Sequence, residues 1–302
     1  MDINLNDFVT DKQLDNLIMT AMQEDMGVAH LDVTSETFIP ADLRGQASMV
    51  ARETGKLAGI ALLHKVAAAY SGSEPTDQIE VELLLPDGST ITQGDTVARF
   101  TGSMRRILSM ERVALNLVTH LSGVASLTWQ YAEKCLDTNA KIYDTRKTIP
   151  GLRGLHKYAV RCGGGASHRM GLYDAVLIKD NHIAHLGIDD LHQALTEAVK
   201  RAHSKFDNLK FIQVEVDTLN QLKQVLNTGI DMVLLDNMTN EQLREAVVIR
   251  DSQDPGVQLE ASGRVNLQTV QDIAKTGVDR ISVGALTHSA PVFDFGLDII
   301  EQ

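Results

Sequence analysis

The 302-residue sequence is poor in proline and cysteine and has no long apolar run. With six prolines and no low-complexity tract, long disordered segments are not expected. Two cysteines, Cys135 and Cys162, are too few for a disulfide scaffold, and their spacing matches no metal motif. The first residues lack the basic and apolar regions of a signal peptide, and no stretch approaches the ~18 apolar residues that span a membrane. These absences predict a cytoplasmic protein without a membrane segment.

Positive charge is also scarce, except in one segment. The net charge of −12 argues against general nucleic-acid binding, because phosphate backbones favour broad basic surfaces. Between Lys141 and His182, however, eight Lys and Arg residues stand against three Asp residues, which gives this segment a charge of +5. The segment also contains three histidines and the run Gly163–Gly165. A cationic, glycine-rich segment in an acidic chain indicates a site for a small, highly anionic ligand.

The second half of the chain alternates short apolar runs with helical patterns. Apolar residues at three- and four-residue spacing predict helices over Ile188–Lys205, Leu219–Thr228 and Asn240–Arg250. Gly229 and Gly277 stand where helix C-caps are expected. The alternation predicts a parallel β/α architecture, either a barrel or an open sheet. The expected strands are Lys141–Tyr143, Ala175–Ile178, Phe211–Val214, Met232–Leu235, Val257–Leu259 and Arg280–Val283.

Each of these expected strands ends in polar or charged residues. In β/α barrels the carboxyl ends of the strands form the active site. The strand phase therefore predicts that residues far apart in the sequence converge at one edge. They are Asp144, Arg146, Lys147, Lys179, Glu215, Asp236, Glu260, Ser262 and Gly284.

The first 120 residues or so have a different pattern, typical of an α+β domain with an antiparallel sheet. Helices are expected at Leu14–Met26 and Ala61–Tyr70, and Met104–Cys135 is either one long helix or a pair broken at Gly123. Strands are expected at Gln46–Glu53, Ile79–Leu85 and Thr96–Thr101. We expect one domain over residues 1–120 and a second over 121–287, with the tail 288–302 packing back on the first.

Several motifs, taken together and in order, resemble the quinolinate phosphoribosyltransferase family. They are DTRKT-x-P-G-x-R from Asp144, SHR at Ser167–Arg169, LIKDNH at Leu177–His182, then EVD, LLDNM, EASG and SVGALTHS. The likeness covers nearly the whole chain, including ERVALNLVTHLSG at Glu111–Gly123. It implies a sandwich-like N-terminal α+β domain and an open, incomplete α/β barrel. It also implies a homodimer, or a higher oligomer, whose sites are shared between subunits.

The reaction implied by the resemblance joins quinolinate to phosphoribosyl pyrophosphate, with Mg²⁺. Its products are nicotinate mononucleotide, pyrophosphate and carbon dioxide. Quinolinate carries two adjacent carboxylates, which suit planar, bidentate binding by arginine. Arg146, Arg169 and Lys179 match the family's substrate contacts, and Thr145 is placed beside them. Arg112 matches a contact from the neighbouring subunit, although a surface arginine paired with Glu111 is the alternative.

The phosphates and the ribose account for the other expected site residues. Lys147 and His168 are expected near pyrophosphate. The 5′-phosphate is expected at two strand ends, because barrels commonly bind phosphate at their last strands. Those ends are Ser262, Gly263 and Arg264, followed by Val283, Gly284 and Ala285.

Carboxylates complete the expected site. Glu215 and Asp236 are expected to hold Mg²⁺ and the ribose hydroxyls, or to stabilise the positive charge that develops at C1′. Ion pairing with the cationic segment is the alternative for these two acids. With Lys147 and Lys179 they form the expected catalytic set. Asp144, Asp180 and Asp217 fit structural roles, and His288 fits either a phosphate contact or a packing role.

Three other functions stay open from the sequence. A lysine at a strand end, such as Lys179, also resembles the Schiff-base lysine of a class I aldolase. That function would leave the arginine pair and the carboxylate pair without a role. A related phosphoribosyltransferase acting on another anionic aromatic is the second alternative, and a non-catalytic anion-binding protein is the third.

Overall fold

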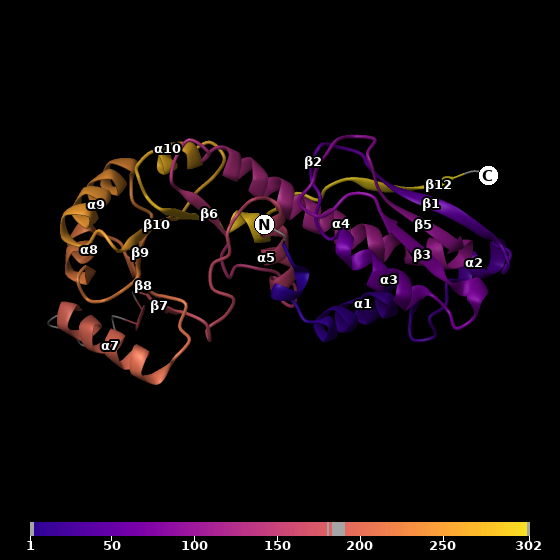
Figure 1. Ribbon diagram of the computed structural model, residues 1–302, viewed down its shortest axis with the longest axis horizontal. Helices are drawn as coiled ribbons and strands as arrows, with labels where there is room; N and C mark the ends of the chain where they lie inside the picture. Colours follow the sequence, from indigo (N-terminus) through magenta and orange to yellow (C-terminus); the bar gives the residue numbers. More distant parts are fainter. Residues whose placement is uncertain (1–2, 180, 183–190, 301–302) are drawn as a thin grey trace. The chain divides into compact units, whose positions relative to one another are not determined.

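The computed structural model describes residues 3–179, 181–182 and 191–300. Within these residues the chain forms two compact units (Figure 1). The first contains the described parts of Met1–Trp129, Gly154–Gly164 and Ala290–Gln302. The second contains the described parts of Gln130–Arg153 and Gly165–Ser289. Because both units combine segments that are separate in sequence, the domain limits expected at residues 120 and 287 stay a prediction.

The first unit is built on an antiparallel sheet in the strand order β12-β1-β5-β3. These strands span Phe295–Ile300, Arg44–Ala51, Thr96–Ser103 and Ile79–Leu83. A small pair, β2 (Gly55–Lys56) and β4 (Thr90–Ile91), forms beside them. Strand β12 pairs with β1 from Ala51↔Phe295 to Gln46↔Ile300, so the end of the described chain lies in this sheet.

Three amphipathic helices share one core with this sheet. They are α1 (Asp11–Met26), α3 (Leu63–Tyr70) and α4 (Met104–Glu133). Helix α1 begins with a capping box, in which Thr10 and Gln13 each accept a backbone N–H from the other residue. It buries Leu14, Ile18, Met22 and Met26, the three- and four-residue spacing that predicted it. The remaining short elements are η1 (Leu5–Asp7), α2 (Val33–Phe38), η2 (Ile60–Leu62) and η3 (Pro75–Asp77).

Helix α4 runs without a break through Gly123, so the single-helix alternative is confirmed and the broken pair is wrong. Gly123 is needed here for close packing and not for a turn. A Cβ atom at this position would lie 1.9 Å from the carbonyl oxygen of Pro291. The glycine therefore lets the segment that leads to β12 cross the helix at backbone distance.

The second unit contains a parallel sheet in the order β6-β11-β10-β9-β8-β7. No ladder joins β6 to β7 in the part of the chain that the structure describes, so this sheet is open. The strands span Lys141–Tyr143 (β6), Val176–Ile178 (β7), Ile212–Val216 (β8), Met232–Asp236 (β9), Gln258–Ser262 (β10) and Arg280–Ser282 (β11). Apolar residues dominate β7 and β9, whereas β6, β8, β10 and β11 also carry polar or charged residues.

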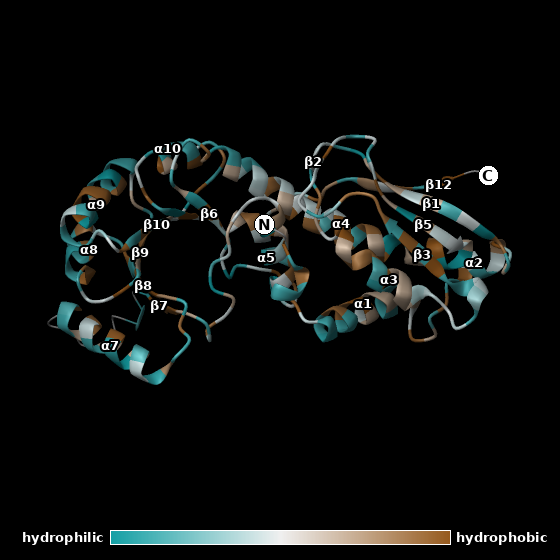
Figure 2. Ribbon diagram, in the orientation of Figure 1, coloured by the Kyte–Doolittle hydropathy of each residue, from teal (hydrophilic) through white to brown (hydrophobic). Residues whose placement is uncertain are grey.

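Helices follow the strands and lie outside the curve of the sheet (Figure 1). They are α7 (Leu191–Lys205), α8 (Leu219–Val225), α9 (Asn240–Gln253), α10 (Val270–Ala274) and α11 (Ala285–His288). Polar residues alternate with apolar ones along α7 and α9, as Figure 2 shows, and the apolar ones, such as Leu195 and Leu243, are buried. Gly229 and Gly277 adopt positive φ angles, +85° and +94°, in the turns before β9 and β11. The predicted fold class is confirmed.

None of the helices in the described ranges is long and apolar enough to cross a membrane.

A pair of histidines, one buried and one half-buried, joins α4 to α5 (Arg153–Cys162) in the first unit. The Nε2 atoms of His120 and His156 lie 2.7 Å apart, so one ring donates a hydrogen bond to the other. His156 is fully buried, and its Nδ1 atom has no hydrogen-bond partner among the described residues. Burial, helped by the neighbouring His120, lowers the pKa of His156 to about 4, and burial also lowers the pKa of His120.

This pair predicts a loss of stability in acid. Since His156 titrates near 6.5 when unfolded and near 4 when folded, the unfolded chain binds more protons between these values. The free energy of unfolding should therefore fall as the pH drops from 6.5 towards 4. In His156→Gln, urea unfolding curves across this range should show a shallower fall. His203→Gln, at an exposed position on α7, is the control. Parallel curves for wild type and His156→Gln would contradict the prediction.

Candidate functional site

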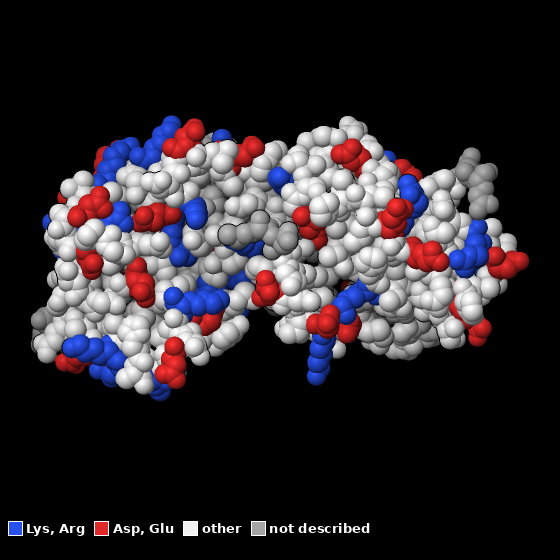
Figure 3. Space-filling model, viewed as in Figure 1, with Lys and Arg blue, Asp and Glu red and all other residues white. Residues whose placement is uncertain are grey.

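A cleft of about 430 Å³ opens at the carboxyl ends of the parallel strands in the second unit. Lys and Arg side chains gather on the visible face of this unit near β6 and β9 (Figure 3). Ten residues expected from the sequence line the cleft: Thr145, Arg146, Lys147, His168, Arg169, Lys179, Glu215, Asp236, Glu260 and Ser262. The remaining lining comes from Leu177, Leu234 and Ser282. The predicted convergence of strand ends is therefore found in the structure for these residues.

Two arginines form the most strongly cationic part of the cleft. Arg169 is 8% exposed and donates from Nη1 to the carbonyl of Ala175 at 3.2 Å. Burial, together with the positive charge of Arg146, lowers the pKa of Arg169 below its ordinary value. Arg146 follows β6, and its buried Nε atom makes no hydrogen bond within the described residues. Two adjacent guanidiniums that repel each other favour an anion between them.

Lysines extend the positive charge in two directions. Lys147 is exposed, but its backbone is fixed at both sides. Its N–H donates to Thr145 Oγ1 at 3.0 Å, and its carbonyl accepts from Thr287 Oγ1 at 2.7 Å. Lys179, directly after β7, forms an ion pair with Glu215 on β8. The Glu215 side chain is 13% exposed against 45% for Lys179, so the carboxylate belongs to the wall and the ammonium faces the open cleft.

Asp236, at the end of β9, is held by its neighbour Asn237. The Asn237 side-chain amide donates to Asp236 Oδ2 at 2.6 Å, and the Asn237 backbone N–H donates to the Ser262 carbonyl at 2.9 Å. Asn237 has a φ of +53°, an uncommon conformation that its short polar side chain tolerates. Gly263 makes room for it: with a φ of +95°, a Cβ there would lie 2.2 Å from Asn237 Oδ1.

Beneath the cleft lies a layer of buried polar side chains. His168 is 7% exposed, and Glu260 and Gln213 are fully buried. His168 Nε2 lies 3.1 Å from Gln213 Oε1, and its Nδ1 accepts the backbone N–H of Arg169 at 2.8 Å. Strand phase predicts Glu260 at this edge of the sheet but gives it no role, and it does not predict Gln213 or Ser282 here. Glu260 and Arg280 are charged residues within two short strands of a covered sheet, and this is the sequence signal that could have revealed the layer.

Other expected site residues do not line this cleft. Gly263 and Arg264 follow β10, and Val283, Gly284 and Ala285 follow β11. Val283 is buried and donates its N–H to the Tyr143 carbonyl at 2.9 Å. A Cβ at Gly284 would lie 3.2 Å from Lys147 Cδ and 3.1 Å from His288 Nε2, so this turn is next to the lysine. Asp180 lies outside the described residues.

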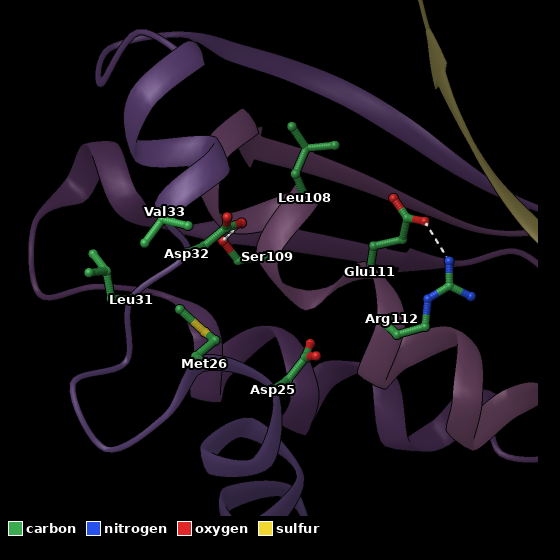
Figure 4. A pocket seen from close by; sticks show the side chains of 9 residues that line it. All are labelled: Asp25, Met26, Leu31, Asp32, Val33, Leu108, Ser109, Glu111 and Arg112. Atoms are coloured by element: carbon green, nitrogen blue, oxygen red, sulfur yellow. Dashed lines mark hydrogen bonds and ion pairs between the residues drawn. The ribbon is translucent and has the colours of Figure 1, made fainter.

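Arg112 belongs to the first unit, on α4. It lines a pocket of about 340 Å³ with Asp25, Met26, Leu31, Asp32, Val33, Leu108, Ser109 and Glu111 (Figure 4). Its guanidinium lies 3.6 Å from the Glu111 carboxylate, and its side chain is 64% exposed. The pairing with Glu111 that the sequence offered as the alternative is therefore present in this chain.

No group of three or more His, Cys, Asp or Glu side chains arranged to hold a metal ion occurs in the described ranges. Three carboxylates belong to the cleft lining: Glu215 and Asp236 are partly exposed, while Glu260 is fully buried and paired with Arg280. Mg²⁺ commonly uses one or two carboxylates together with substrate phosphates and water. The donor set therefore fits a metal brought in with a phosphorylated ligand.

A parallel α/β sheet with a cationic, carboxylate-edged cleft at its carboxyl ends is the arrangement of a β/α enzyme that binds a small anion. Comparison with known proteins identifies the family. Residues 32–122 match the N-terminal domain model of quinolinate phosphoribosyl transferase, and residues 124–298 match its C-terminal domain model. The chain belongs to the quinolinate phosphoribosyltransferase family.

Individual relatives agree over nearly the full length. A nicotinate-nucleotide pyrophosphorylase (carboxylating) of Mycobacterium leprae is 40% identical over 93% of this chain and 95% of its own. A probable one from Bacillus subtilis is 36% identical, covering 95% and 93%. The solved structure of the Francisella tularensis nicotinate-nucleotide pyrophosphorylase superposes with a TM-score of 0.87 at 34% identity, over 99% of this chain and 100% of that one.

The contact between Gly263 and Asn237 predicts an activity defect for Gly263→Ala. The new methyl group would displace Asn237, which holds Asp236, and it would strain a φ of +95°. Small displacements of positioned groups lower rates by about 100-fold, so we expect kcat/KM to fall by about 10- to 100-fold. Gly256→Ala is the control, because its Cβ would meet no atom closer than 4.0 Å. Wild-type kinetics for a folded Gly263→Ala protein would argue against this role of Asn237.

Proposed function

We propose that this chain transfers the phosphoribosyl group of phosphoribosyl pyrophosphate to quinolinate and releases carbon dioxide. The products are nicotinate mononucleotide and pyrophosphate, in the biosynthesis of NAD. The observation that carries the proposal is the cleft itself. It gathers four cations, Arg146, Lys147, Arg169 and Lys179, beside the carboxylates Glu215 and Asp236, in a chain of this family.

Quinolinate is placed between Arg146, Arg169 and Lys179. Its two adjacent carboxylates need several fixed positive charges, and guanidiniums bind planar carboxylates through paired hydrogen bonds. Support comes from the buried Arg146 Nε without a hydrogen bond in the described structure and from the close Arg146–Arg169 pair. Lys179 is ion-paired with Glu215, so a quinolinate carboxylate would share or replace that contact.

Phosphoribosyl pyrophosphate is placed towards Lys147, with Thr145 fixing the lysine backbone. The 5′-phosphate is assigned to the turns Ser262–Arg264 and Val283–Ala285, as in barrels that bind phosphate after their last strands. The closeness of Gly284 to Lys147 supports one continuous phosphate-binding region. His168 lies in the wall of the cleft, and both of its ring nitrogens already face protein partners. A direct contact with pyrophosphate would therefore require His168 to give up one of these hydrogen bonds.

Glu215 and Asp236 are the residues that would hold Mg²⁺ and the ribose hydroxyls. Bound Mg²⁺ would neutralise pyrophosphate and make it a better leaving group. The protein itself then orients the reactants: its cations hold both anions, and its two carboxylates face the ribose. These carboxylates would stabilise the positive charge that builds up at C1′.

The proposed reaction exchanges a bond at C1′ of the ribose and then a bond at C2 of the pyridine ring. The C1′–O bond of phosphoribosyl pyrophosphate breaks, and pyrophosphate leaves with the electron pair. The quinolinate nitrogen supplies its lone pair to C1′ in line with the leaving group, since both reactants are held in place. The pyridinium then withdraws electrons from C2, the bond to the adjacent carboxylate breaks, and carbon dioxide leaves. The pair left on C2 takes up a proton, for which Lys179 is a candidate donor.

The Schiff-base alternative is weaker in this structure. An aldolase lysine must be free to attack a carbonyl carbon, whereas Lys179 is engaged in an ion pair with Glu215. A Schiff-base enzyme would also leave Arg146 and Arg169 without a ligand. A related phosphoribosyltransferase with another anionic aromatic substrate uses the same site, so it is distinguished by the substrate test below.

The active form is proposed to be a homodimer in which Arg112 completes the site of a second copy. The pocket that contains Arg112 is rimmed by apolar side chains that are exposed in the single chain, with Leu31 at 51% and Val33 at 66% (Figure 4). Exposed apolar residues around an open charged pocket are typical of a protein interface. The same surface is compatible with an assembly larger than a dimer.

A cytoplasmic location, with neither a membrane nor a nucleic acid as partner, is also part of the proposed function. Cys135 and Cys162 are free and buried, which fits a reducing compartment.

The reaction is tested by mixing the protein with quinolinate, phosphoribosyl pyrophosphate and Mg²⁺. Nicotinate mononucleotide and carbon dioxide should form in equal amounts. Nicotinate, which lacks the second carboxylate, should react far more slowly because one of the anionic groups that the arginines bind is missing. Turnover of nicotinate but not of quinolinate would overturn the assignment, and loss of activity with EDTA would support the role of Mg²⁺.

The shared site is tested by mixing subunits of Arg112→Ala and Lys179→Ala, each expected to be inactive alone. In a heterodimer with shared sites, one site carries both substitutions and the other carries none. Random mixing should then restore about one quarter of wild-type activity, because half of the dimers are mixed. Heterodimers shown by differently tagged subunits, but without recovered activity, would rule out a shared site.

A further inference from the structure

A buried ion pair lies directly beneath the cleft. Glu260 on β10 is fully buried, and Arg280 on β11 is 6% exposed. Arg280 Nε lies 3.1 Å from Glu260 Oε2, and its guanidinium stacks 3.6 Å from the centre of the Tyr143 ring. Burial by itself would raise the pKa of Glu260, but His168, Arg280 and Ser282 together lower it. Glu260 is therefore held as a carboxylate in the interior of the second unit.

This carboxylate determines how Gln213 is oriented. A carboxylate only accepts hydrogen bonds, so the Gln213 amide must present its NH₂ group to it, at 3.2 Å from Glu260 Oε2. The amide oxygen of Gln213 then faces His168 Nε2 at 3.1 Å. Glu260 Oε1 lies 3.5 Å from the same nitrogen. Two acceptors thus face Nε2, which must carry the proton.

The other ring nitrogen of His168 contacts the backbone of Arg169, a residue of the cleft lining. His168 Nδ1 accepts the backbone N–H of Arg169 at 2.8 Å, which it can do only when it carries no proton. The ring itself is fixed by edge-on packing against Phe211, with 5.3 Å between ring centres. The backbone N–H of His168 donates to Asp144 Oδ1 at 2.8 Å. The contact that holds the Arg169 N–H therefore exists only in one tautomer of the imidazole, whereas the bond to Asp144 is independent of it.

We propose that Glu260, a fully buried residue of the cleft wall, is a positioning residue for the quinolinate site, which it controls through Gln213 and His168. By orienting Gln213, it fixes the Nε2–H tautomer of His168, and that tautomer holds Arg169 with its guanidinium in the cleft. The inference rests on the proposed function for its kinetic part only. In the other tautomer, the Nδ1–H of His168 and the N–H of Arg169 would face each other, and Arg169 would move.

The proposed role of Glu260 depends on its negative charge, so Glu260→Gln is the informative variant. Glutamine has the same shape, but its amide can turn either way, so Gln213 and His168 are no longer forced into one arrangement. Glu245→Gln, at an exposed position on α9, makes the same chemical change without the network and serves as the control.

The tautomer is read by ¹⁵N NMR of histidine-labelled protein, with the His168 signals identified by their absence in His168→Gln. Wild type should show a protonated Nε2 and an unprotonated Nδ1 at His168. Glu260→Gln should show a mixture of tautomers, and its KM for quinolinate should rise about 10-fold, as is typical when an outer partner of a binding residue is lost. Its KM for phosphoribosyl pyrophosphate should change much less. Glu245→Gln should behave as wild type in each measurement.

A general loss of stability would not produce this pattern. Since Glu260→Gln leaves Arg280 as a buried charge without a carboxylate, the double variant Glu260→Gln/Arg280→Met is made in parallel to remove both charges. It should fold even where the single variant does not, and it should keep the mixed tautomer and the raised KM. A wild-type tautomer and KM in either folded variant would overturn the proposal. Wild-type protein that shows no turnover of quinolinate would refute the proposed function, and the NMR result would still decide the role of Glu260.

Discussion

The candidate site depends on the parallel hydrogen-bonded ladders of the second unit. These ladders align Ser262 with Asp236, Glu215 with Leu234 and Ile178 with Val214. Because parallel strands run in one direction, the residue after each strand lies at the same edge. Asp236 and Ser262, and likewise Lys179 and Glu215, become neighbours through this register, although they are far apart in sequence.

Charge in the cleft is arranged in two levels. At the open level, Arg146, Arg169 and the lysines face Glu215 and Asp236. Below it, Glu260 and Arg280 balance each other out of contact with solvent. A buried ion pair is a weak source of stability, because desolvation offsets most of its attraction. Its value here lies in fixing hydrogen-bond direction, since a carboxylate accepts only and an arginine donates only.

Uncommon backbone conformations occur at the same edge of the sheet. Asn237, Gly263 and Arg264 adopt positive φ angles of +53°, +95° and +50° directly after β9 and β10. Such conformations persist where surrounding contacts over-determine them, and they often mark functional sites. Here the contact between Asn237 and Asp236 gives the conformation of Asn237 a purpose, because it fixes the carboxylate that faces the cleft.

Local sequence patterns were enough to predict the long helices, most of the longer strands and the sheet edge on which the site lies. Periodicity is local, so Leu14–Met26 and Met232–Leu235 were predicted in nearly their observed bounds. Strand phase alone placed Arg146, Glu215 and Asp236 together. Tertiary structure decided that α4 passes Gly123 unbroken and that α5 joins the first unit. It also decided that Gln213 and Glu260 meet His168. These outcomes depend on contacts between segments distant in the chain, whose packing and direction no local pattern encodes.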